Sequence, residues 1–112
     1  MVMSIFAELQ ELLNPIIPTE NDTFPEKPPE TYAVLTSLDD RLDLYADDYP
    51  QVEIVSVRIS VFTKHNYLSL VKRIKKLLLG CDFVITRTAK IDYERDTKYH
   101  HYAIEVEKDY SF

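Results

Sequence analysis

Five aspartates fall within ten residues of this 112-residue chain and form its densest group of side chains able to bind a metal ion. They are Asp39, Asp40, Asp43, Asp47 and Asp48. Carboxylate oxygens are the ligands that calcium prefers, but an EF-hand loop also needs a glycine at its sharp turn and a closing glutamate. This segment has neither. We therefore interpret it as an acidic surface that faces water or a partner, and the sequence predicts no bound metal or cofactor.

Histidine and cysteine offer no better site for catalysis or for zinc. In a strand, His100 and His101 point to opposite faces, so together with His65 and the single Cys81 they cannot surround a zinc ion. We interpret Cys81 as a small buried apolar residue in preference to a reactive thiol. No serine lies in a G-x-S-x-G motif, and a chain with one glycine cannot build the usual phosphate-binding loop. The sequence predicts a protein that is not an enzyme.

Charge is segregated along the chain, whose net charge is −6. Residues 20–53 contain ten acidic and two basic side chains, whereas residues 54–81 contain six basic and no acidic ones. One interpretation is two separate solvated surfaces. The other is that acidic and basic faces of neighbouring copies meet, because complementary charge orients association. Sequence-specific nucleic-acid binding is disfavoured, since the chain is acidic and its bases are not interleaved with exposed aromatic residues.

The length predicts a single domain over residues 1–112. The chain is 46% apolar and 29% charged, which is ordinary for a globular protein. Its apolar runs are far shorter than the roughly 20 residues that span a membrane, and the early Glu8 and Glu11 disfavour a secretory signal. We expect the protein to stay inside the cell that makes it.

The central elements expected are a strand over residues 52–62 and a helix over residues 67–79. Alternating valine and isoleucine place one face of the strand in a core. The opposite face is expected to meet water or a partner through Ile54, Ser56, Arg58, Ser60 and Phe62. Apolar residues recur every three or four positions in the helix, and Asn66 is a suitable N-cap. The outer side of the helix carries Lys72, Arg73, Lys75 and Lys76.

The first third of the chain predicts less regular structure. A helix over residues 4–13 begins with Ser4 as N-cap and ends at a proline. Residues 16–17 predict a short extended piece at a sheet edge. The proline-rich residues 19–30 predict a loop, either free or docked on a partner, and residues 31–38 predict a strand.

The remaining segments complete an antiparallel hairpin. Residues 39–50 predict either the tip of a long hairpin or an excursion before the central strand, and Gly80 predicts a left-handed end to the helix. Strands over residues 83–93 and 98–107 pair, and the tail after them either frays or contacts a neighbouring subunit. One face of the first of these strands is expected to hold Phe83, Ile85, Ala89, Ile91 and Tyr93. The predicted fold class is α+β: an antiparallel-rich sheet of about four to five strands, with two helices packed on one face and the other face free.

Three blocks of sequence are distinctive in their order and spacing. They are the acidic residues 44–48, the strand and helix of residues 57–78, and the closing hairpin of residues 93–104. Together they resemble the tail-completion, or tail-terminator, proteins of long-tailed (siphovirus-like) bacteriophages and prophages. Phe62 stands where many of those proteins have a tryptophan, and His65-Asn66 stands where a glycine or aspartate is common.

The resemblance implies a structural virion protein that forms a hexameric ring at the head-proximal end of the tail tube. The ring stops tube polymerisation and joins the filled head, after assembly in the host cytoplasm. Its implied partners are other copies of the chain, the tail tube protein and a head-tail connector protein, with DNA passing non-specifically and no membrane. Our candidate interface residues are Ile54, Arg58, Phe62, Lys72, Arg73, Lys75 and Lys76. Our candidate acidic lumen or partner surface is Asp39, Asp40, Asp43, Asp47 and Asp48.

Two other functions fit the same size, acidity and fold class. One is a neck or head-completion connector protein, which would also form a ring but would bind on the head side of the junction. The other is a cellular adaptor domain with no viral role.

Overall fold

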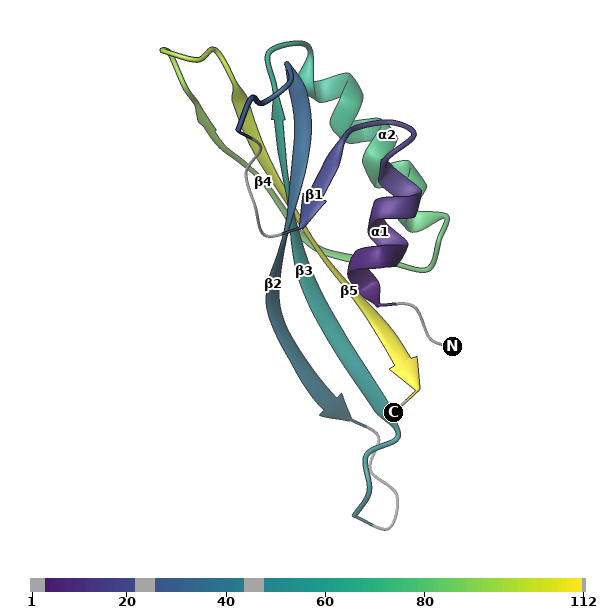
Figure 1. The fold of residues 1–112 in the computed structure, drawn as a ribbon. Helices are drawn as coiled ribbons and strands as arrows, with labels where there is room; N and C mark the ends of the chain where they lie inside the picture. The colour runs from purple at the N-terminus through teal and green to yellow at the C-terminus, as the bar shows by residue number, and fades with distance from the viewer. Residues whose placement is uncertain (1–3, 22–25, 44–47, 112) are drawn as a thin grey trace.

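The computed structural model describes residues 4–21, 26–43 and 48–111. Within these ranges the elements are α1 Ile5–Leu13, β1 Thr19–Asn21, β2 Thr31–Asp43, β3 Val52–Thr63, α2 Tyr67–Leu79, β4 Val84–Tyr93 and β5 His100–Ser111 (Figure 1). The strands form one sheet in the order β1-β2-β3-β5-β4. Only β1 and β2 pair in parallel, and every other pair is antiparallel. The predicted α+β class, with a mostly antiparallel sheet and two helices, is confirmed.

The core lies between the two helices and one face of the sheet, here called the helix face. Its fully buried side chains include Ile59 at the centre of β3, Leu9 in α1 and Ile74 in α2, each 0% exposed. Val57 and Val61 lie on the same side of β3 as Ile59, as the alternating pattern predicted. Burial of these apolar faces against one another is the main force that holds both helices on the sheet.

Three strands run on past the helices. Strands β2, β3 and β5 contain 13, 12 and 12 residues, and Figure 1 shows their lower ends projecting beyond α1. The chain is accordingly elongated, with principal extents of 55 × 24 × 22 Å. We call residues 38–43, 52–56 and 107–111 the distal end of the sheet.

The two predicted helix N-caps are confirmed. Ser4 Oγ accepts a hydrogen bond from the Ala7 amide at 3.1 Å, and Asn66 Oδ1 accepts one from the Leu68 amide at 3.1 Å. The prediction of a left-handed Gly80 was wrong, because its φ of −75° continues the right-handed turn. The left-handed residue is Asp82, with φ of 65°, two positions later.

The sequence placed the first edge strand too early. Residues 16–17 form a turn, in which the amides of Ile16 and Ile17 both donate to the Leu13 carbonyl at 2.8 Å. The edge strand is β1, which lies inside the segment predicted as a loop. Thr19 begins it, with its amide held by Asn14 Oδ1 at 3.1 Å.

Strands β2 and β5 are longer than the sequence predicted. Strand β2 continues to Asp43 in register with β3, so the described part of residues 39–50 belongs to a long hairpin and not to an excursion. Strand β5 continues to Ser111, so of the two alternatives given for the tail, fraying was wrong for residues 108–111. The end of β5 is fixed to α1, because Lys108 Nζ lies 3.3 Å from Glu8 Oε1 and the Tyr110 hydroxyl donates to the same carboxylate.

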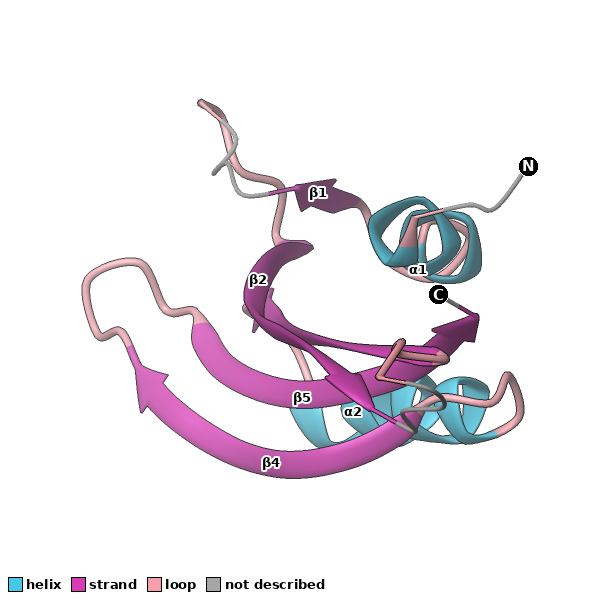
Figure 2. Cartoon of the chain, turned by 90° about the horizontal axis from the view of Figure 1, so that it is seen from below, coloured by secondary structure: helices cyan, strands magenta, loops and turns pink. Residues whose placement is uncertain are grey.

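Bulges change the faces of the edge strands. The register of β4 against β5 shifts between Ile85 and Arg87 and again between Lys90 and Asp92. Each extra residue reverses the alternation, so the predicted common face was wrong for Ala89, which lies on the opposite side from Ile85. A third bulge, at Leu38, interrupts β2. Figure 2 shows that β4 and β5 also curve strongly along their length.

Candidate functional site

The sheet face opposite the helices, here called the open face, is not uniformly free. At its upper end Tyr32, Val34, Phe62 and Tyr99 form a second apolar cluster, separate from the main core. The Phe62 ring stacks on Tyr32 with centroids 4.8 Å apart and on His101 at 4.3 Å. Phe62 is only 6% exposed. Its face was predicted correctly, but the expectation that it is available to a partner was wrong.

The hairpin between β4 and β5 closes this cluster from above. Tyr99 lies just before β5, and its hydroxyl donates to the Pro29 carbonyl at 2.6 Å. Lys64 lies over the Tyr99 ring, 4.9 Å from its centroid. A hydrogen bond of 2.7 Å between His65 and Glu30 holds the residue that follows Pro29 in the same loop. The described part of the proline-rich segment therefore docks on its own chain.

Below the cluster, ion pairs connect four strands across the open face. Glu105 on β5 accepts from Arg58 on β3 at 3.0 Å and from Arg87 on β4 at 3.2 Å. One step further along β5, Glu107 pairs with Arg41 on β2 at 3.4 Å. Exposed ion pairs add little to the free energy of unfolding. They favour this register of the strands, because another register would separate the opposite charges. The predicted interface residue Arg58 is thus half-buried and engaged within the chain.

Burial lowers the pKa of His101 below its ordinary value of 6.5, against the smaller raising effect of Glu94. As the pH falls below about 6.5, the unfolded chain takes up this proton before the folded chain does. We expect the free energy of unfolding to fall between pH 7.5 and pH 5.5, by about 0.5 kcal/mol or less because the ring is partly exposed. Urea unfolding at both pH values measures this, and the His101→Gln variant should show a smaller loss. An equal loss in that variant would contradict the assignment.

The bases predicted on the helix lie on the other side of the molecule from Arg58 and Ile54. Lys72, Arg73 and Lys76 are exposed on α2. Lys75 is half-buried and donates to the Tyr102 hydroxyl at 3.1 Å. Hydrogen bonds from Thr88 and Lys75 lower the pKa of that hydroxyl. The candidate interface predicted as one set is therefore two separate surfaces, one on α2 and one on the open face.

The acidic residues lie at the distal end of the sheet. Asp39, Asp40 and Asp43 belong to β2 and are exposed. Asp48 is exposed in a turn with φ of 61°, and Asp47 lies outside the described residues. In residues 4–21, 26–43 and 48–111, no three acidic, histidine or cysteine side chains are grouped closely enough to hold a metal ion. None of the helices in these ranges is both long and apolar enough to cross a membrane.

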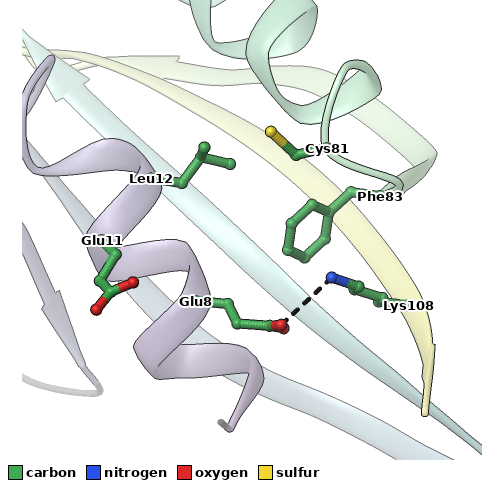
Figure 3. Close-up of a pocket in the computed structure, with 6 residues that line it drawn as sticks. All are labelled: Glu8, Glu11, Leu12, Cys81, Phe83 and Lys108. Atoms are coloured by element: carbon green, nitrogen blue, oxygen red, sulfur yellow. Dashed lines mark hydrogen bonds and ion pairs between the residues drawn. The ribbon is translucent and has the colours of Figure 1, made fainter.

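A cleft of about 400 Å³ opens between α1 and the segment that joins α2 to β4 (Figure 3). It is lined by Glu8, Glu11, Leu12, Cys81, Phe83 and Lys108. The Glu8 carboxylate and the Lys108 amine, 3.3 Å apart, close one side, and the amine also lies 4.9 Å from the centroid of the Phe83 ring. Cys81 was predicted to be a small buried apolar residue, and it is half-buried and packs against the core. The cleft holds no base in contact with the thiol among these lining residues, so it suits packing more than chemistry.

Two uncovered edges of the sheet, on β2 and β4, were not predicted from the sequence. Among the residues that the structure describes, β1 pairs with β2 at residues 33–35 and no strand pairs with the same side of residues 36–43, which we call the uncovered edge of β2. Within the described ranges no strand pairs with the outer side of β4. Exposed apolar side chains lie along both edges: Leu38, Leu42, Val84, Ile91 and Tyr93. Only the strand order, which depends on tertiary structure, identifies these segments as edges.

No family model matches its sequence, and no curated protein is similar enough to count as a relative.

Proposed function

We propose that this protein assembles into a ring that closes the head-proximal end of a phage tail tube and joins the tail to the head. The proposal starts from the resemblance of three sequence blocks to tail-terminator proteins. The observation that carries it is the pair of uncovered strands at opposite sides of one sheet, β2 beyond residue 35 and β4.

A closed ring needs two different surfaces on every subunit, because each copy contacts one neighbour on either side. The two uncovered edges meet this requirement, since they face in opposite directions and differ in charge. Three aspartates lie on the β2 edge, whereas Arg87 and Lys90 lie on the β4 edge. Long uncovered edges are normally paired, covered or blocked in native proteins, and pairing with a neighbour would satisfy both.

The other exposed surfaces would then meet the tube and the connector. The bases of α2 present positive charge on the helix side of the sheet, and the ion pairs of the open face form a polar surface on the other side. In such a ring the aspartates of β2 would act as a partner surface between subunits, which is one of the two roles expected for the acidic segment. The ring would act sterically, by covering the growing end of the tube.

The test is deletion of the gene from the phage or prophage that encodes it, followed by electron microscopy of the particles. We expect tails longer than normal, because nothing stops polymerisation of the tube. Normal tails beside unjoined heads would contradict the proposal and support a neck protein. Unchanged particles would contradict both and support a cellular adaptor. Supplying the intact gene in trans is the control, and it should restore normal tail length.

A further inference from the structure

The two uncovered edges are complementary in strand direction and in the positions of their charged side chains, as well as in net charge. All residues from 36 to 43 on β2 are exposed, and so are most residues of β4. Strand β2 is antiparallel to β3, β3 to β5 and β5 to β4, so β2 and β4 run in opposite directions. Rotation of one copy about an axis along the strands preserves these directions. It therefore brings β4 of one copy against β2 of the next as an antiparallel pair, without inverting either subunit.

The charged side chains on the two edges have the same spacing and the same order of faces. The registers place Asp43 and Arg87 on the open face, and Asp40 and Lys90 on the helix face. In an antiparallel pair, Arg87 opposite Asp43 puts Lys90 opposite Asp40. Each pair then joins opposite charges on one face of the combined sheet, which is the arrangement that stabilises cross-strand contact.

Apolar side chains fit the same alignment. The same alignment would place Leu42 opposite Thr88 on the helix face, and Leu38 and Ile91 close to each other at its end. Leu38 and Ile91 both occupy bulges and are 40% and 47% exposed in the single chain. A shift of one residue would place every charged partner on the wrong face.

We propose that the partner of the β4 edge is the β2 edge of a second copy of this chain, paired antiparallel over residues 87–90 and 40–43. This contact rests on the proposed ring in that it supplies the joint between subunits. Repulsion between Asp39 and Asp92 at one end confines the pairing to this stretch. The wild-type contact weakens as salt concentration rises, because its charges lie at the surface.

Charge reversal tests the joint. One variant carries Asp40→Lys with Asp43→Lys, and the other carries Arg87→Glu with Lys90→Glu. Each has two edges of like charge, and we expect about 100-fold weaker self-association, measured by native mass spectrometry and light scattering at rising protein concentration. An equimolar mixture should recover assembly, with equal numbers of the two variants in each particle. That recovery also shows that both variants fold.

The control is Lys27→Glu with Arg95→Glu, at two exposed positions outside both paired stretches, which changes the net charge as much as the β4 variant does and should assemble normally. The proposal is overturned if the wild-type chain does not associate, if either reversal variant assembles like the wild type, or if the mixture stays dissociated. Normal assembly of both reversal variants, with overlong tails in the deletion, would reject this joint and leave the tail function standing. A charge-dependent joint with unchanged tails would reject the tail function alone.

Discussion

Replacing Phe62 with alanine will lower the free energy of unfolding by about 3–5 kcal/mol, the cost typical of a large aromatic side chain removed from a core. Phe62 is 6% exposed and lies between Tyr32 and His101. The ring of Tyr99 is nearly perpendicular to that of Phe62, with the two ring centroids 6.5 Å apart. Its loss leaves the second cluster without its central ring and removes aromatic contacts that contribute beyond buried area. Urea unfolding followed by circular dichroism measures the effect.

The matched variant is Phe62→Leu, which keeps an apolar side chain of similar bulk. We expect it to cost less than about 1.5 kcal/mol. If the alanine variant costs less than the leucine variant, or if both cost under about 1 kcal/mol, Phe62 does not belong to a packed cluster and is available to partners after all.

The second large effect concerns the attachment of α1. Leu9 is 0% exposed and lies on the side of α1 that packs into the main core, between Ile5 and Leu13. Replacing it with alanine removes buried methyl groups and leaves a cavity, so we expect a loss of about 2–5 kcal/mol. Equilibrium urea unfolding measures the loss.

Leu12 provides the comparison within the same helix. It is half-buried at the cleft of Figure 3, where solvent or neighbouring side chains can fill the space. We expect Leu12→Ala to cost under about 1 kcal/mol. Hydrogen exchange then separates two outcomes for Leu9→Ala: faster exchange in α1 alone means that the helix undocks locally, whereas faster exchange throughout means global destabilisation. Equal costs at Leu9 and Leu12 would contradict the packing described for α1.

The central strand and helix could be predicted almost to the residue because their signals are local. Valine and isoleucine alternate through β3, and Asn66 caps α2 just before an apolar stripe begins. Strand β1 carries no comparable signal. Its three residues, Thr19–Asn21, form a strand because residues 33–35 of β2 lie beside them, and nothing in the three residues themselves indicates that pairing.

The second cluster and the edge contacts depend on register, which the sequence does not encode in any one segment. Tyr99 was expected to lie in the closing hairpin, but nothing local indicates that it packs on Tyr32 or bonds to Pro29. Glu105 alternates with core residues along β5, so its face follows from the pattern, whereas its partner Arg58 follows only from the pairing of β3 with β5. The bulges in β4 likewise reverse faces that strict alternation would assign.

The projecting strands have a consequence for how the single chain moves through solution. Its radius of gyration is 15.3 Å, compared with about 13 Å for a compact domain of this length. Such a shape experiences more friction than a sphere of equal mass, so one copy will elute from a sizing column earlier than its 13.1 kDa predicts. An early peak alone therefore does not distinguish a slowly diffusing monomer from a dimer, and the stoichiometry of assemblies must come from a measurement of mass.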